Sequence, residues 1–192
     1  MTETQLKLQD AATQMKIALQ NGGNESIFRS CINAFIAAAR SVTMVMERES
    51  KHQPELLDWY KARTEELGPL PLFRFFNSQR IYTIHCGVVQ PAGRQYPVHK
   101  YERGVIEAGD GSSLTSHTFT IDDDDYVMNP NDIFFGAGTD AMIVWDFPEG
   151  RQFFPSESSN VPRLCEEYFA ILKALVHEWL ELRTKLGIRN NL

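Results

Sequence analysis

The feature that most constrains the fold of this chain is a long apolar stripe on residues 25–49. Apolar side chains recur there every three or four positions, which is the spacing of one face of an α-helix. The stripe comprises Phe28, Cys31, Ile32, Phe35, Ala38, Ala39, Val42, Val45 and Met46. Its alanines permit close approach of a second helix. We therefore expect a long helix whose apolar face packs against other helices.

A second long stripe lies at the other end of the chain, on residues 161–186, and Gly187 ends it. Its apolar residues in helical phase are Leu164, Tyr168, Ile171, Leu172, Leu175, Trp179 and Leu182. A helix of this length needs a partner face, because most helical stability comes from packing. The stripe on 25–49 is the natural candidate, so we expect the two ends of the chain to close one bundle.

The rest of the chain divides at His85. Before it, helical spacing bounded by Asn, Gly or Pro predicts three further helices, at 4–20, at 54–67 and from near Pro71. After it, alternating or β-branched runs separated by turn residues predict strands. These runs are 96–107, 113–121, 132–135 and 141–147.

The sequence thus predicts an α+β protein that is mainly α. An up-and-down helix bundle is expected from residues 1–86 and 158–192, with an antiparallel β-rich insertion at 87–157, before the last helix. At 192 residues the chain has the length of one domain, or of one domain with an insertion.

Charge is unevenly distributed. The chain carries a net charge of −6, which argues against a broad nucleic-acid-binding surface. Residues 86–155 hold four basic and eleven acidic side chains, whereas the remainder holds fifteen basic and fourteen acidic ones. A local phosphate site therefore stays possible outside the insertion. The acidic run Asp122–Asp125 is interpreted as a solvated turn, or as a surface for a basic protein partner.

The sequence indicates neither a membrane-spanning protein, nor a disulfide-linked one, nor a zinc protein. No apolar run approaches the roughly 18 residues that span a bilayer, and the three scattered cysteines indicate reduced thiols, so we expect a cytoplasmic protein without membrane contact. The only grouping that could chelate a transition metal matches no closed zinc site. It consists of His85, Cys86, His99 and His117. No metal or other cofactor is expected.

Arg80 and His85 are the candidate catalytic residues. A guanidinium group can hold a phosphate, and an imidazole can move a proton near neutral pH. Residues five apart on a helix point roughly 140° away from one another, so the pair can share a site only if the helix ends between them or if a second protomer completes it. The β-branched and aromatic run 81–84 and the breaker Gly87 favour a helix end there.

An alternative stays open in which the same two residues only stabilise the fold and take no part in catalysis. Arg80 would form an ion pair with Glu65 or Glu66, and His85 would only cap a helix end.

Three sequence elements resemble bacterial HEPN-type helical proteins. They are Cys31–Val42 (CINAFIAAARSV), the pair Trp59–Tyr60 and the segment Phe75–Arg80 (FFNSQR), in that order, with a looser match at Cys165–Tyr168. The resemblance covers about 25–86 and part of 161–186. Active members of that superfamily are metal-independent ribonucleases that work as dimers and carry an R-x(4–6)-H motif.

The resemblance implies a homodimeric endoribonuclease, or toxin-like effector, acting on RNA. Arg80 would stabilise the charge on the phosphate, His85 would act as acid and base, and Asn77, one turn before Arg80, would help to bind the substrate. Active members commonly have a polar residue after the arginine, whereas this chain has Ile81. That departure favours the alternative, a non-catalytic interaction module whose acidic insertion binds a protein partner.

Overall fold

The structure, a computed structural model, describes residues 1–102, 105–108, 113–115, 134–135, 141–154 and 159–188. Five α-helices lie in these ranges: α1 (Glu3–Gln20), α2 (Glu25–Ser50), α3 (Pro54–Leu67), α4 (Pro71–His85) and α5 (Val161–Lys185). The strands are β1 (Ala92–Glu102), β2 (Val105–Ala108), β3 (Ser113–Thr115), β4 (Phe134–Phe135) and β5 (Ala141–Asp146), followed by the 3₁₀ helix η1 (Pro148–Gln152). The prediction of a mainly helical α+β protein is confirmed.

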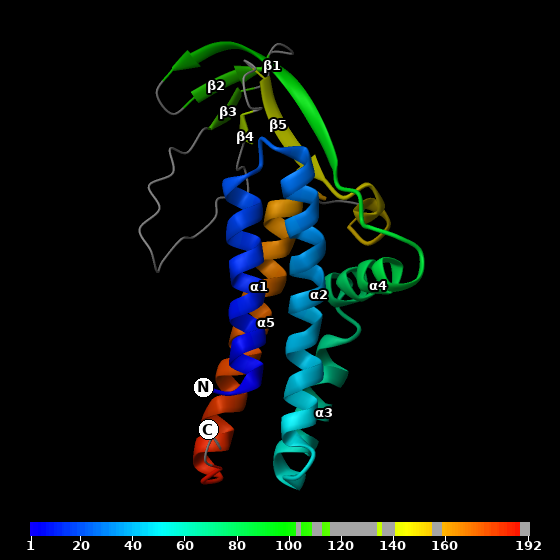
Figure 1. Ribbon diagram of the computed structural model, residues 1–192, viewed down its shortest axis with the longest axis vertical. Helices are drawn as coiled ribbons and strands as arrows, with labels where there is room; N and C mark the ends of the chain where they lie inside the picture. The colour runs from blue at the N-terminus through cyan, green and yellow to red at the C-terminus, as the bar shows by residue number, and fades with distance from the viewer. Residues whose placement is uncertain (103–104, 109–112, 116–133, 136–140, 155–158, 189–192) are drawn as a thin grey trace.

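The strands form one sheet in the order β3-β2-β1-β5-β4, and all the pairs are antiparallel. The sheet lies at the end of the bundle where α1 turns into α2 (Figure 1). All the strands fall between α4 and α5 in the chain, as the sequence predicts. The division into a bundle domain and an insertion domain stays a prediction, and the run Asp122–Asp125 lies outside the described residues.

Two details of the strands differ from the prediction. The run expected at 96–107 contains parts of two strands, because β1 pairs with β2 as a hairpin. In addition, β1 begins at Ala92, ahead of the predicted run, and includes Gly93. Gly93 fits there because it pairs with Trp145, whose ring would lie only 3.0 Å from a Cβ at this position.

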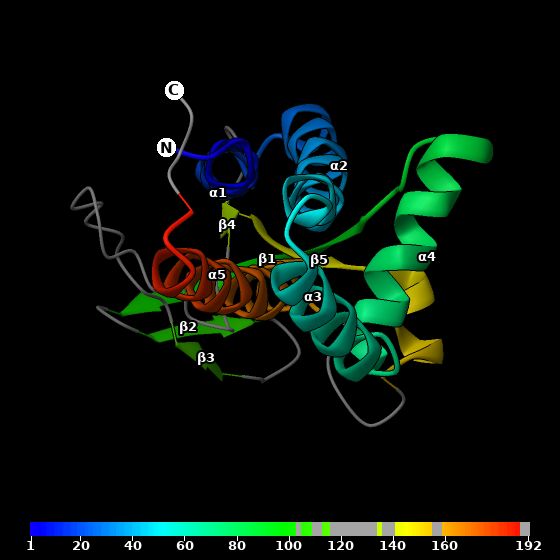
Figure 2. The ribbon, with the colours of Figure 1, turned by 90° about the horizontal axis from the view of Figure 1, so that it is seen from below.

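The long helices α1, α2 and α5 lie side by side (Figures 1 and 2). Phe28, Ile32, Phe35 and Val42 of α2 are fully or almost fully buried. One end of this apolar face packs in a cluster with α1, α4, the sheet and the first part of α5, and the other end packs with α3 and the later part of α5. Trp179 of α5 also donates a hydrogen bond from its indole Nε1–H to the hydroxyl of Ser50, at 3.0 Å. The expected packing of the last helix against α2 is present.

The sheet is fixed to the bundle by Trp145 of β5. Its indole Nε1–H donates to the carbonyl of Gly22 at 2.7 Å, in the turn between α1 and α2. Its ring stacks on Phe28 with the centroids 4.5 Å apart. A buried indole whose N–H has a partner contributes packing without an unsatisfied donor. Trp145 therefore joins the sheet to the α1–α2 hairpin, together with Ile143 of the same strand, which lies in the same buried cluster.

Helix α4 differs from the expected up-and-down arrangement, because it lies across the bundle and not along it (Figures 1 and 2). Its inner face is aromatic. Phe76 stacks on Tyr168 of α5 at 4.3 Å, and Phe75 makes edge contacts with Phe147, Phe153 and Phe154 around η1. Helix α4 is thus held by rings from later parts of the chain. No helix in the described ranges is both long enough and apolar enough to cross a membrane.

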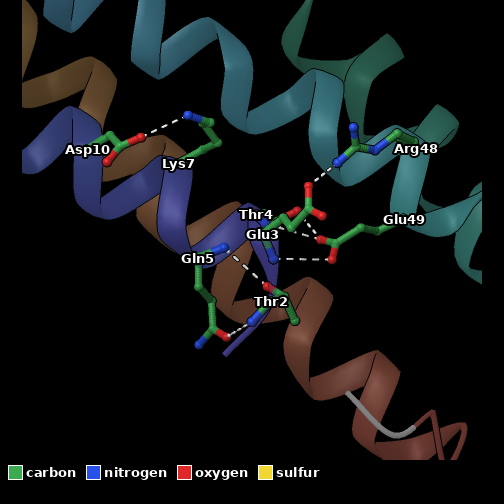
Figure 3. A network of polar contacts seen from close by, with 8 residues as sticks. All are labelled: Thr2, Glu3, Thr4, Gln5, Lys7, Asp10, Arg48 and Glu49. Carbon is green, nitrogen blue, oxygen red and sulfur yellow. Dashed lines mark hydrogen bonds and ion pairs between the residues drawn. The ribbon is translucent and has the colours of Figure 1, made fainter. Parts of the chain in front are cut away.

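The start of α1 is anchored by a carboxylate from α2 (Figure 3). Glu49 accepts hydrogen bonds from the backbone N–H groups of Glu3 and Thr4, at 3.2 and 3.1 Å, and from the Thr4 hydroxyl at 2.6 Å. Thr2 and Gln5 form a capping box at the same end. A negative charge beside unpaired N–H groups and the positive end of the helix dipole is stabilising.

We predict that Glu49→Ala lowers the free energy of unfolding by about 1–3 kcal/mol, because two backbone donors and a buried hydroxyl lose their acceptor. Urea denaturation followed by circular dichroism measures this. The matched control is Glu65→Ala on α3, an exposed glutamate outside this network, which should change the free energy by less than about 0.5 kcal/mol. Equal effects of the two substitutions would contradict an anchoring role for Glu49.

A second prediction concerns alkaline pH. Burial raises the pKa of the Tyr168 hydroxyl to about 12, and the positive charge of Arg40 partly opposes this. In the unfolded chain a tyrosine titrates near about 10. Between these values the unfolded state releases the proton and the folded state keeps it, so stability falls as pH rises.

The expected loss between about pH 10 and 12 is of the order of 2 kcal/mol, at about 1.4 kcal/mol for each pKa unit. Tyr168→Phe should remove this part of the alkaline decline while preserving the ring stack. Urea denaturation at several alkaline pH values compares the two proteins. Parallel declines in the wild type and the variant would show that Tyr168 does not contribute.

Candidate functional site

The candidate catalytic residues lie on α4, and the helix runs unbroken through both of them. The expectation that it ends between Arg80 and His85 is wrong, because α4 continues to His85. The end comes one residue later, where the N–H groups of Cys86 and Gly87 both donate to the carbonyl of Tyr82, at 2.8 and 3.1 Å. Gly87 has a φ of +153°, which L side chains rarely adopt, so it suits the reversal of the chain after the helix.

One face of α4 is buried and the opposite face is exposed. The buried side chains are Leu72, Phe75, Phe76 and Gln79. After Pro71 at its start, the exposed side chains of α4 are Arg74, Asn77, Ile81, Tyr82 and His85, and we call these five residues the outer face of α4. Successive spacings of three, four and four residues place Arg74, Asn77, Ile81 and His85 in one row. Arg74 was not among the predicted site residues, although this spacing is visible in the sequence.

Arg80 lies on the flank of the helix and is half-buried. It is separated from His85 by roughly 140° of rotation, because the helix is regular between them. One chain therefore places His85 in the same exposed row as Asn77 and Arg74, about 12 and 16 Å away along the helix, and it places Arg80 outside that row. Of the two arrangements that the sequence allows for a shared site, only completion by a second protomer is compatible with this geometry.

The alternative ion pair of Arg80 is not formed. Glu66 binds Arg63 at 2.6 Å, and the same guanidinium makes a two-pronged contact with Glu178 of α5 at 2.8 and 3.0 Å. In the part of the chain that the structure describes, Arg80 has no carboxylate partner. Helix α4 itself contains no Asp or Glu. The flank and the outer face of α4 thus carry positive charge that no acid on the same helix offsets.

The segment after α4 is fixed to α2. The amide of Asn33 is paired with Val89 in both directions, accepting from its N–H at 2.8 Å and donating to its carbonyl at 2.9 Å. Arg29 donates to the carbonyl of Pro91 at 3.2 Å. These contacts hold the chain that leaves α4 and so limit how the outer face can move. Val88, between them and the helix, is exposed.

The grouping considered for a metal is only partly described. His85 and Cys86 are exposed at the end of α4, His99 lies in β1, and His117 lies outside the described residues. Among the described residues no three metal-ligating side chains of His, Cys, Asp or Glu lie together.

Comparison with known proteins finds a similarity to a phage family. Residues 2–87 match the family model described as bacteriophage lambda protein ea47. The matched segment runs from the cap of α1 through the whole of α4 and ends before the first strand. It covers less than half of the 192 residues, so it marks a similarity of the first four helices. No curated protein and no solved structure matches the chain.

The exposed thiol at the end of α4 provides a test of this geometry. Cys86 is exposed, whereas Cys31 and Cys165 are buried, and burial raises the pKa of both buried thiols. Since the thiolate is the reactive form, we predict that Ellman's reagent modifies one thiol rapidly in the native protein and three after denaturation. Cys86→Ser should abolish the rapid phase. A rapid phase that survives this substitution would contradict the described end of α4.

Proposed function

We propose that the protein is a cytoplasmic, metal-independent endoribonuclease of HEPN type that acts as a homodimer. Each of its two sites would combine Arg80 of one protomer with His85 of the other. The observation that carries the proposal is the outer face of α4, where Asn77 and His85 lie in one exposed row around apolar Ile81. The resemblance of the segments around Arg40, Trp59 and Arg80 to HEPN proteins supplies the reaction class.

The apolar centre of the outer face supports pairing with a second copy. Ile81 and Tyr82 are adjacent and expose 46% and 47% of their surface. Neighbouring exposed apolar side chains, bordered by polar ones, are typical of a contact surface. A symmetric dimer uses the same surface of both subunits, so two α4 helices would cross about a twofold axis.

An antiparallel crossing at Ile81 has a definite register. A residue that follows position 81 in one helix would lie opposite the residue that precedes position 81 by the same number in the other helix. His85 of one helix would therefore face Asn77 of the other, since each is four residues from Ile81. Arg80 of one helix would then lie close to Tyr82 of the other, within reach of the groove where His85 and Asn77 meet. The three predicted site residues would thus gather twice, once at each end of the crossing.

The chemistry requires only these side chains. His85 would take the proton of a ribose 2′-hydroxyl, the 2′-oxygen would attack the phosphorus, and the bond to the 5′-oxygen would break, with that oxygen taking a proton. Arg80 would stabilise the negative charge that develops on the phosphate in the transition state. The products would be a 2′,3′-cyclic phosphate and a 5′-hydroxyl end. The lack of acidic residues on α4 favours approach of RNA to this side of a chain with a net charge of −6.

We predict that the wild type cleaves a mixed RNA pool in EDTA and that Arg80→Ala and His85→Ala do not. Mixing the two inactive variants after subunit exchange should restore activity, because one site of each mixed dimer keeps both residues. With statistical exchange the recovered activity is about one quarter of the wild-type value, since half of the dimers are mixed and each has one intact site. Gel electrophoresis with end-group analysis measures both results.

The matched control is His177→Ala, because His177 is an exposed histidine of α5, paired with Glu181, on a different helix. It should retain full activity. Failure of the mixture to recover activity, with both variants folded and dimeric, would contradict a site shared between protomers. An inactive wild type would favour the other candidate, an interaction module in which exposed Ile81 and Tyr82 or the acidic insertion contacts a protein partner.

A further inference from the structure

We propose that Tyr82 of α4 is the base-binding residue of the site shared between protomers, and that its ring stacks on a nucleobase next to the scissile phosphate. This role rests on the proposed function, because it assigns a further residue to the same shared site. The argument combines the exposure of the ring with the position of Tyr82 beside the two predicted catalytic groups.

The ring of Tyr82 is available to a ligand. Among the aromatic side chains whose exposure the structure describes, Tyr82 is the only exposed one, with 47% of its surface accessible. Within the described ranges its ring contacts no other ring and no cation, and its hydroxyl has no hydrogen-bond partner. Packing within one chain therefore gives this aromatic residue no role.

Tyr82 is a neighbour of His85 on the outer face of α4. The two residues are three positions apart on one helix, so their Cβ atoms lie about 5–6 Å from each other. The N–H groups of Cys86 and Gly87 both donate to the carbonyl of Tyr82, at 2.8 and 3.1 Å. These hydrogen bonds hold the backbone of Tyr82 in the last turn of the helix. A nucleotide whose ribose lies at His85 is thus within reach of the ring.

The proposed dimer places a phosphate-binding group beside the same ring. Arg80 of one helix would lie opposite Tyr82 of the other, since each is one residue from Ile81. Tyr82 is rotated from Ile81 by about 100° around the helix, so its ring borders the line of contact and does not lie in it. The shared site would therefore hold a phosphate at Arg80, a ribose at His85 and a base at Tyr82.

An aromatic ring suits a base that is not in a duplex. Unpaired bases stack on tyrosine, and every base can do so because each has a π-face. Bases inside a duplex are covered by their neighbours and cannot reach the ring. Arg80 and His85 act on the phosphate and the ribose, which are the same in paired and unpaired RNA. Tyr82 would thus select an unpaired nucleotide without selecting the type of its base.

The hydroxyl of Tyr82 suggests a different role, donation of a proton to the 5′-oxygen that leaves. A phenol titrates near about pH 10, so at neutral pH it transfers protons less readily than an imidazole. The ring is therefore the part of Tyr82 that we assign to the substrate, and substitution by phenylalanine separates the two roles.

The test uses a short single-stranded RNA that spans one cleavage site found in the mixed pool. Tyr82→Leu keeps an apolar side chain at the dimer surface but removes the ring. It should raise KM by about five- to hundredfold, the loss expected for one stacked base, and leave kcat within about twofold. The matched control is Tyr82→Phe, which keeps the ring and should cleave as the wild type does. Light scattering checks that both variants are dimers.

A second measurement removes the base instead of the ring. The same RNA is prepared without the base on either side of the cut. One of these abasic RNAs should raise the KM of the wild type by about the same factor as Tyr82→Leu does. The two losses should not add when this RNA is given to Tyr82→Leu, because both changes remove one and the same stack. The result with the wild type holds even if the leucine weakens the dimer.

Three results would overturn this role while the ribonuclease itself stands. The first is a wild-type KM in Tyr82→Leu. The second is loss of activity in Tyr82→Phe, which would assign the role to the hydroxyl. The third is wild-type cleavage that is unchanged by removal of either base. An inactive wild type would contradict the proposed ribonuclease and this role together, so the two failures are told apart.

Discussion

The apolar face of α2 is the constraint on which the other elements depend. Phe28, Phe35, Ala39, Val42 and Met46 have no exposed surface, and they extend over most of the length of the helix. Each fully buried side chain of the larger kind contributes about 1.5–3 kcal/mol by leaving water. The first half of the face lies in a cluster with α1, α4, β5 and the first part of α5, and the second half lies in a cluster with α3 and the later part of α5. The positions of all these elements are therefore fixed relative to one helix.

The crosswise position of α4 depends on the same constraint. Its aromatic residues pack against Phe35 of α2, Tyr168 of α5 and the rings around η1, which belong to three separate parts of the chain. A helix aligned with α2 could bury one stripe against the bundle, but it could not reach both α5 and η1. The crossing leaves the opposite side of α4 without a cover. The exposed row that contains Asn77 and His85 is thus a result of how the aromatic side was buried.

Much of this arrangement could be predicted from the sequence, because each buried helical face has a clear period of 3.6. The end of α4 was predicted too early, since β-branched and aromatic residues lower helix propensity only slightly and tertiary packing overrides the difference. The contact of Gly93 with Trp145, 52 positions later, is invisible in a local pattern. The separation of Arg80 and His85 around a regular helix followed from their spacing, and only the continuity of α4 through both residues required the structure.

The role of α5 has a consequence for the segment that resembles the phage family. That segment ends at position 87, but the buried surfaces of Val42 and Met46 are covered by Leu175, Val176 and Trp179, which come after the strands in the chain. The first four helices are therefore an incomplete fold. In this chain α5 completes the cover of that face, although it follows the strands in the sequence.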